Sequence, residues 1–202
     1  MKHYFSYIAL VCALCSGMSV ASLPATAGTM ITTGSAVVPP SGFIGFCVKY
    51  SQECLVSGQD ATVRELTSAR RAELEAVQAK VNAEIKPQEE PTHVWEYART
   101  GTGDCNTFAL TKRRALIAMG WPEETLLLAA AYTEQGEGHL VLVARTSQGD
   151  LILDNRLKPV VDWTVLPYRW VSMQSQKSPA RWLQIVSRRI ADATALPGRT
   201  VR

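Results

Sequence analysis

The sequence predicts an α+β fold in which a long helix packs on an antiparallel β-sheet. Apolar residues recur at helical spacing up to about residue 119, and short apolar runs separated by glycine turns follow from residue 126. The 202 residues allow one domain, or two very small ones. Hydrophobic residues make up 47% and charged residues 19%, which is typical of a globular protein and excludes global disorder or a coiled coil.

The charge of the chain is weak and mixed in sign. The net charge is +3, from 21 basic and 18 acidic residues. We therefore expect neither nucleic acid nor an anionic membrane as the main partner. The basic run Lys112-Arg113-Arg114 falls within a predicted helix, where we expect it to form a solvated face.

The first 27 residues have the pattern of a secretory signal peptide. Lys2 and His3 give a positive start, Tyr4 to Cys15 is apolar, and Ala25-Thr26-Ala27 is a cleavage site of small residues. Ser19-Val20-Ala21 is a weaker cleavage site, and an uncleaved anchor is the alternative. The apolar stretch is too short for a transmembrane helix, so we expect an exported protein without stable membrane insertion after cleavage.

Helices are predicted for the first half of the mature chain. Residues 28–58 are rich in Gly, Pro, Ser and Thr, and we expect them to be irregular. Asp60 caps a predicted helix that extends to about Ile85, and Pro87 and Pro91 then bracket a linker. The residues that give this helix its spacing are Val63, Leu66, Ala69, Leu74, Val77, Val81 and Ile85.

A second long helix is predicted after a glycine loop. A short helix at Val94–Ala98 comes before the loop. Asp104 then caps a helix over Cys105–Met119, and Gly120 ends it.

Short strands are predicted for the second half of the chain. Tight turns at Gly136–Gly138 and Gln148–Asp150 favour an antiparallel arrangement of consecutive strands. The predicted strands are Leu126–Tyr132, His139–Arg145, Leu151–Asp154, Tyr168–Met173 and Trp182–Val186. We expect one domain over residues 28–192 and a flexible tail over residues 193–202.

Cleavage of the signal peptide would leave three cysteines: Cys47, Cys54 and Cys105. Export implies an oxidising compartment, where paired cysteines tend to form disulfides. Cys47 and Cys54 are separated by six intervening residues in a Gly- and Pro-rich segment and are a natural local pair. Cys105 is then left as a lone thiol, which suggests a reactive residue, unless it pairs with Cys47 or Cys54 instead.

Cys105, His139 and Asp154 form the candidate catalytic site. Cys105 begins a helix, where free N–H groups and the positive end of the helix dipole favour a thiolate and could hold an oxyanion. His139 begins one strand and Asp154 ends the next, so an antiparallel pair makes them neighbours at one sheet edge. A nucleophile, a base and an orienting carboxylate are the parts that nucleophilic hydrolysis requires.

Each of these residues also has a structural interpretation. Cys105 could be a small buried residue, His139 a strand histidine, and Asp154 a turn cap beside Asn155. His93 is the other candidate base, but it lies in the Pro-bracketed linker. A Cys/His zinc site lacks support, because the mature chain has three cysteines, two histidines and no Cys-x-x-Cys pair.

Several short blocks form a distinctive pattern in chain order. They are Trp95, Gly101-Thr102-Gly103-Asp104-Cys105, Lys112-Arg113, Leu116 with Met119-Gly120, His139-Leu140-Val141-Leu142 and Leu153-Asp154-Asn155. The pattern resembles the bacterial transglutaminase-like cysteine proteinases, over about Gly42 to Val186 and including the Phe46-Cys47 and Cys54 region. These are papain-like enzymes of the periplasm, and their LapG-type members release large biofilm adhesins.

The resemblance implies a papain-like or transglutaminase-like fold and hydrolysis of a protein substrate. Carried over by position, Cys105 would be the nucleophile, His139 the general base and acid, and Asp154 the orienting carboxylate. The resemblance further implies a periplasmic location, a protein substrate such as a surface adhesin, and an inhibitory regulator as a partner.

One departure from the family pattern concerns calcium. Calcium-dependent members carry an acidic pair directly after the nucleophile, whereas this sequence has Asn106 and Thr107 there. Asp104 is the acidic residue that remains, as a weak calcium candidate. Because carboxylates supply most of the affinity of calcium sites, we expect calcium binding to be weak and no cofactor to be required.

Three alternative functions fit parts of the pattern. An amine that intercepted the acyl-enzyme would make the same site a transglutaminase. Cell-wall amidases or peptidases of related fold often carry Asp-Cys-Ser-Gly, where this chain has Asp104-Cys105-Asn106-Thr107. A non-catalytic binding module on the same fold is the third, and an unreactive or disulfide-bonded Cys105 would indicate it.

Overall fold

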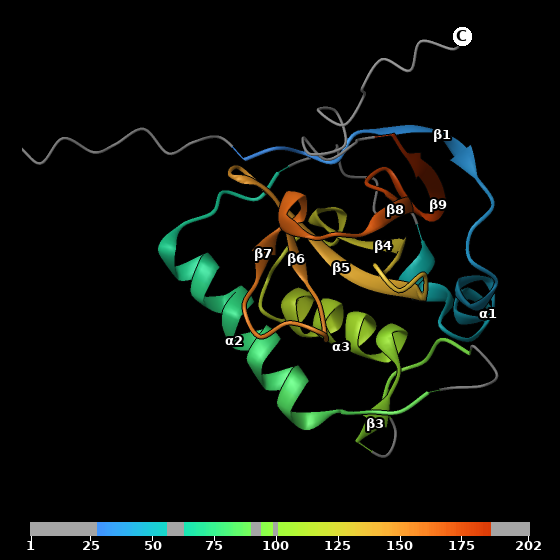
Figure 1. The fold of residues 1–202 in the computed structure, drawn as a ribbon, viewed down its shortest axis with the longest axis horizontal. Helices are drawn as coiled ribbons and strands as arrows, with labels where there is room; N and C mark the ends of the chain where they lie inside the picture. The colour runs from blue at the N-terminus through green and yellow to red at the C-terminus, as the bar shows by residue number, and fades with distance from the viewer. Residues whose placement is uncertain (1–27, 56–62, 90–93, 99–100, 187–202) are drawn as a thin grey trace, which may run out of the picture.

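The computed structural model describes residues 28–55, 63–89, 94–98 and 101–186 (Figure 1). The predicted signal peptide, the predicted tail, Asp60 and His93 lie outside these residues. In chain order the elements are β1 (Thr33–Val37), α1 (Ser41–Lys49), η1 (Ser51–Cys54), α2 (Ser68–Glu84), β2 (Lys86–Pro87), β3 (Thr102–Gly103), α3 (Cys105–Ala118), η2 (Glu123–Thr125), β4 (Leu126–Tyr132), β5 (Gly138–Thr146), β6 (Gly149–Leu153), β7 (Val161–Asp162), η3 (Trp163–Val165), β8 (Arg169–Ser175) and β9 (Ser178–Ile185).

The main sheet has seven antiparallel strands in the order β1-β9-β8-β4-β5-β6-β7. Strands β4 to β6 follow one another in the sheet, as the glycine turns predict, and β7, which was not predicted, pairs with β6. Gly149 begins β6 with a φ of 105°, a left-handed backbone that favours glycine and lets the chain reverse at once. Strands β8 and β9 continue the sheet on the other side of β4. The predicted α+β fold with an antiparallel sheet is confirmed.

The apolar residues of the central strands divide between two hydrophobic clusters. In β4, Leu126 and Leu128 belong to the larger cluster, whereas Leu127 belongs to the smaller one. Leu142 and Val143 of β5 divide in the same way. Since successive side chains of a strand point to opposite faces, the two clusters lie on the two faces of the sheet. Burial on both faces explains why β4 and β5 are almost continuously apolar.

Helices α2 and α3 cover one face of the sheet (Figure 1). Helix α3 packs against β5, and α2 packs against α3. Leu74, Val77 and Val81 of α2 are buried at helical spacing, as predicted. Within the described residues, no helix combines the length and the apolar character needed to cross a membrane.

The expectation that residues 28–58 are irregular was wrong. This segment contains strand β1 and helix α1, although Gly and Pro are frequent in it. Phe43 and Phe46 of α1 are each 2% exposed and pack into the larger cluster. Burial of these two rings against the rest of the molecule stabilises a helix that local propensity does not predict.

Two predicted helix boundaries also differ from the structure. Helix α2 begins at Ser68 because the Thr67 hydroxyl accepts the N–H of Arg70 at 3.2 Å, and residues 63–67 are not helical. The short helix expected at Val94–Ala98 is absent from the structure, where this segment has no regular structure and buries Trp95.

The basic run of α3 is not a solvated face, because α3 lies between the sheet and α2. Lys112 and Arg113 are 0% and 4% exposed. The Arg113 side chain donates to the carbonyl of Leu126 at 3.1 Å and pairs with Glu53 at 3.2 Å. Only Arg114 of the three keeps a largely exposed side chain, at 54%.

Candidate active site

The loop before α3 makes Cys105 the first residue of the helix. The Asp104 carboxylate caps the helix by accepting the N–H groups of Asn106 and Thr107 at 3.0 and 3.1 Å, so it does not compete for the N–H of Cys105. Gly103 packs closely on Thr107, and an added Cβ would lie 2.5 Å from the Thr107 Cβ. Cys105 therefore lies at the positive end of the α3 dipole.

His139 and Asp154 meet at one edge of the sheet. Strands β5 and β6 pair with Leu142 opposite Leu153, so the start of β5 lies beside the end of β6. The His139 Nε2 lies 2.9 Å from the Asp154 Oδ1, and the two side chains are 6% and 0% exposed. The adjacency expected from the antiparallel pairing is thus present, as a buried hydrogen bond.

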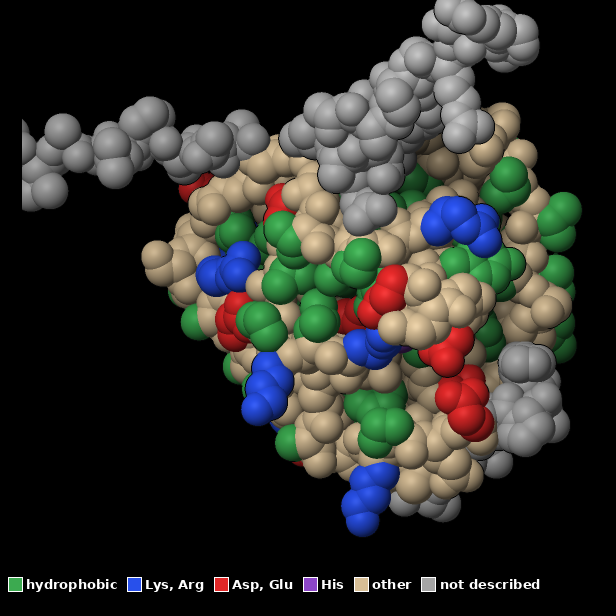
Figure 2. All heavy atoms as spheres, in the orientation of Figure 1, with side chains coloured by type: hydrophobic (Ala, Val, Ile, Leu, Met, Phe, Trp, Pro, Cys, Tyr) green, Lys and Arg blue, Asp and Glu red, His purple; other side chains and the backbone are tan. Residues whose placement is uncertain are grey.

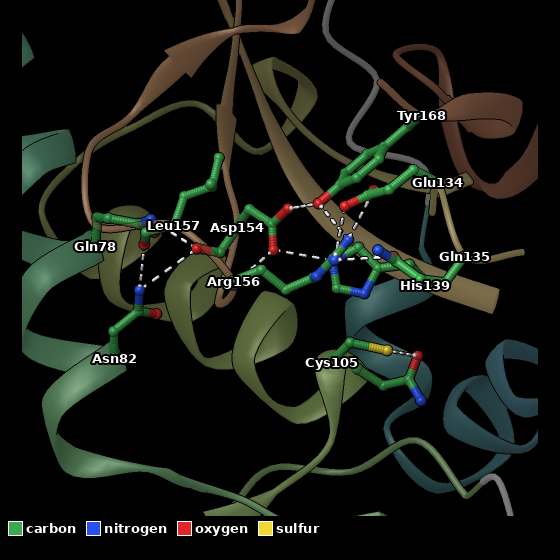
Figure 3. Close-up of polar contacts among 11 residues, drawn as sticks. Gln78, Asn82, Cys105, Glu134, Gln135, His139, Asp154, Arg156, Leu157 and Tyr168 are labelled. Atoms are coloured by element: carbon green, nitrogen blue, oxygen red, sulfur yellow. Dashed lines mark hydrogen bonds and ion pairs between the residues drawn. The ribbon is translucent and has the colours of Figure 1, made fainter. Parts of the chain in front are cut away.

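Cys105 approaches His139 from α3, and Figure 3 shows the thiol below the imidazole ring. Burial opposes protonation of His139. Hydrogen bonds to Asp154 and Cys105, together with the negative charges of both, outweigh burial and raise the pKa of His139 to about 9. In this arrangement the imidazole is protonated at neutral pH, and a protonated imidazole stabilises a neighbouring thiolate.

Cys105 is the free cysteine of the described residues and is partly exposed. Cys47 and Cys54 form a disulfide with each other, with Cα atoms 5.7 Å apart. The alternative pairing of Cys105 with either of them is therefore not present in the structure.

The Asp154 carboxylate is enclosed by hydrogen-bond donors (Figure 3). Its Oδ1 accepts from His139 and from the backbone N–H of Arg156 at 2.9 Å, and its Oδ2 accepts the Tyr168 hydroxyl at 2.5 Å. Burial opposes ionisation, but the hydrogen bond and charge of His139, helped by the other donors, keep the pKa of Asp154 below its usual value. The carboxylate is therefore charged across the neutral range.

Two amides of α2 hold the backbone that follows Asp154. The Gln78 Nε2 donates to the carbonyls of Asp154 and Leu157 at 2.7 and 2.9 Å, and the Asn82 Nδ2 donates to Leu157 at 2.9 Å. Gln78 is 0% exposed, so these bonds are shielded from water. Helix α2 thereby fixes the turn that carries the carboxylate.

A cleft of about 900 Å³ is lined by both Cys105 and His139. Ala130 and Gly138, from β4 and β5, also line it, and their small size leaves space beside the imidazole. Trp95 contributes a largely buried ring to the same cleft. The thiol and the imidazole thus adjoin a space of the size that small-molecule and peptide sites commonly have.

A match to a protein family identifies the class of protein that carries this site. The model of the bacterial transglutaminase-like cysteine proteinase BTLCP matches residues 33–190, which is most of the chain. The chain belongs to this family. It is therefore a member of a family of cysteine peptidases, as the sequence pattern predicts.

Other comparisons find solved structures that are similar to the proteinase. One structure of Legionella pneumophila LapG is 23% identical, covers 61% of the proteinase and 72% of LapG, and gives a TM-score of 0.47. Calcium-bound Legionella pneumophila LapG is 22% identical, covers 62% of the proteinase and 73% of that chain, and gives a TM-score of 0.49. No curated protein matches the proteinase.

The residues around Asp104 do not fit a calcium ion. The Asp104 Oδ1 caps α3, and its Oδ2 accepts the side-chain amide of Asn106 at 2.7 Å. This amide presents hydrogen atoms to the carboxylate, where a cation would need oxygen ligands. Throughout the part of the chain that the structure describes, no group of three or more His, Cys, Asp or Glu side chains could hold a metal ion.

Sequence reasoning missed four residues of this site: Gln78, Asn82, Arg156 and Tyr168. Gln78 and Tyr168 reach Asp154 across 76 and 14 positions of the chain. Neither contact follows from a local pattern, because each depends on how α2 and the segment before β8 pack. Arg156 had a signal, since it follows Asp154 and Asn155 in the turn after β6.

Proposed function

We propose that the proteinase is a periplasmic cysteine endopeptidase that cleaves a protein substrate through Cys105, His139 and Asp154. The observation that carries this proposal is a partly exposed free thiol beside a buried imidazole that is hydrogen-bonded to a buried carboxylate. Membership of a cysteine peptidase family supports amide hydrolysis as the reaction. The signal-peptide pattern of residues 1–27 supports export.

The reaction begins with Cys105 as a thiolate and His139 as an imidazolium. The thiolate attacks the carbonyl carbon of the scissile amide, and the resulting oxyanion lies against the N–H of Cys105 at the start of α3. The imidazolium gives its proton to the leaving nitrogen, the C–N bond breaks, and the amine departs. A thioester then joins Cys105 to the acyl part of the substrate.

Water completes the cycle. Neutral His139 takes a proton from water, and the hydroxide attacks the thioester carbonyl, so that the thiolate leaves and the carboxylic acid is released. Asp154 keeps the Nε2 of His139 protonated and thereby directs Nδ1 toward Cys105 and the water. An amine in place of this water would give the transglutaminase reaction.

The partners of the proteinase are inferred from its family and its charge. We expect a protein substrate at the cell surface, such as an adhesin, and an inhibitory protein regulator. Acidic and basic side chains are interspersed on the face seen in Figure 2, and the net charge is only +3. This distribution supports a protein partner over nucleic acid. The Asn106 amide on Asp104 supports hydrolysis without calcium.

Digestion of a proteome-derived peptide library tests this activity, with new peptide termini read by mass spectrometry. We expect the wild-type proteinase to create new termini with the chelator EGTA as well as with calcium, and Cys105→Ala to create none. Equal cleavage by the wild type and Cys105→Ala would contradict the assignment of Cys105. Cleavage of purified muropeptides, with no cleavage of the library, would instead assign the cell-wall hydrolase alternative.

A further inference from the structure

Tyr168 contacts two members of the candidate triad, and the mechanism above gives it no part. It lies between η3 and β8 and is 4% exposed. Its hydroxyl lies 2.5 Å from the Asp154 Oδ2. Its ring meets the ring of His139 nearly at right angles, with the centroids 5.6 Å apart and an interplanar angle of 79°.

Arg156 fixes the direction in which the Tyr168 hydroxyl points. The Arg156 Nη1 donates to the Tyr168 oxygen at 3.2 Å, and Glu134 pairs with the same guanidinium at 3.1 Å. Since the phenol oxygen accepts from Arg156, its own proton is directed to Asp154 (Figure 3). Burial and the Asp154 charge raise the pKa of Tyr168 well above its ordinary value, so the hydroxyl remains a donor.

The geometry gives this hydroxyl a specific task. A carboxylate rotates about its terminal bond with little preference, so its plane is set by its hydrogen bonds. Two donors share Oδ1 of Asp154, whereas among the hydrogen bonds of the described residues Oδ2 has only the Tyr168 hydroxyl. Without that bond, rotation carries Oδ1 away from the His139 Nε2.

We propose that Tyr168 is a positioning residue for hydrolysis, which holds the Asp154 carboxylate in the plane where it meets His139. The inference rests on the proposed function for its effect on rate. Tyr168 does not line the cleft around Cys105, so it acts through Asp154 and not on the substrate. Arg156 and Glu134 extend the same chain of contacts to the turn between β4 and β5.

Tyr168→Phe removes the hydroxyl and keeps the ring against His139. We expect kcat to fall on the order of tenfold, with KM little changed, because a hydrogen bond to a charged group is lost away from the substrate. We also expect the pKa of Asp154 to rise, because a donor to its charged form is removed. Carbon-13 NMR of the Asp154 carboxyl measures that pKa.

Tyr97→Phe is the matched control. The Tyr97 hydroxyl also donates to a carboxylate, Glu53, at 2.7 Å, but Tyr97 packs against Phe46 and Tyr50 and does not line the cleft. We expect it to leave both kcat and the Asp154 titration as in the wild type. An unchanged Asp154 titration and an unchanged kcat in Tyr168→Phe would overturn the proposal.

A graded replacement covers the case in which Tyr168→Phe fails to fold. An ortho-fluorotyrosine at position 168 keeps the hydroxyl and makes it a stronger donor, so the pKa of Asp154 should move down, opposite to the Phe variant. Lys112 also interacts electrostatically with Asp154. Because Lys112 is present in both the Phe variant and the fluorotyrosine protein, it does not account for a difference between their Asp154 pKa values. No shift with the fluorinated residue would overturn the proposal. The titration needs no substrate, so it separates this inference from failure of the proposed hydrolysis.

Discussion

At the scale of single residues, negative and positive groups alternate along the site, at an edge of the sheet where the His139 and Asp154 side chains are almost completely buried. The Asp154 carboxylate is negative, and the His139 imidazolium beside it is positive. In the proposed mechanism, the Cys105 thiolate completes the series at the cleft. Each charge is stabilised by its neighbour, so removing one member is expected to change the ionisation of the next.

Asp154→Asn tests this dependence. Loss of the carboxylate charge should lower the pKa of His139 from about 9 toward its ordinary 6.5, as measured by NMR titration of the ring. We expect hydrolysis to fall by about two to four orders of magnitude, because the imidazole loses its charge partner and its fixed tautomer. Asp162→Asn, which alters only the cap of η3, is the control.

The same shift predicts a pH dependence of stability. The folded-state pKa of His139 lies above its unfolded value, so its contribution to the free energy of unfolding is complete below about pH 6.5 and is lost as the pH rises through about 9. Asp154→Asn should remove this contribution. A His139 pKa that stays near 9 in the variant would contradict the charge series.

At the scale of elements, one feature of helix α3 could be predicted from the sequence and another could not. Its start could be predicted from Asp104 and its glycine loop, because capping is a local interaction. The burial of Lys112 could not, since it depends on α2 and the sheet closing over the same helix. For α3, the sequence shows which residue begins the helix, but not how many of its faces other elements will cover.

Lys112→Met tests the cost of that burial. The Lys112 Nζ is buried without a hydrogen-bond partner among the described residues, and burial lowers its pKa to about 7, against a smaller opposing effect of Asp154. The unfolded chain then binds more protons between pH 7 and 10.5, so Lys112 makes wild-type stability rise with pH across that range, by up to about 1.4 kcal/mol per pH unit.

We therefore expect Lys112→Met to be more stable than the wild type at pH 7 and below, with a difference that narrows toward pH 10.5. Urea unfolding at a series of pH values measures the difference. Lys80→Met is the control, because the Lys80 side chain is 71% exposed on α2. A variant that is less stable than the wild type at every pH would contradict this interpretation of Lys112.

At the scale of the whole molecule, the sequence predicted the order of the main helices and strands better than the contacts between distant parts of the chain. The long helices and the three strands from β4 to β6 follow from periodicity and glycine turns, whereas β7 was not predicted. Helix α1 does not, because its rings are stabilised by contacts with distant residues such as Trp95 and Trp182. His139 and Asp154 could be paired from strand order alone, whereas Tyr168 and Gln78 required the packed structure.

The disulfide ties α1 to η1, and its removal tests what it adds to the fold. The Cys47–Cys54 bond spans seven positions, a short loop, so the double variant Cys47→Ser, Cys54→Ser should lose about 2 kcal/mol of stability in urea unfolding. The alkylation rate of Cys105 should stay as in the wild type. An unchanged unfolding midpoint would contradict a stabilising role of the disulfide. A changed alkylation rate of Cys105 would contradict a role confined to stability.

The most direct test of the central claim is the rate at which iodoacetamide alkylates Cys105 at about pH 6, in the wild type and in His139→Ala. We expect fast alkylation in the wild type, located at Cys105 by mass spectrometry, and alkylation slowed at least about tenfold in the variant, because His139 no longer stabilises the thiolate. Equally slow alkylation of both proteins would contradict a Cys105–His139 ion pair, and with it the assignment of the site as an active peptidase.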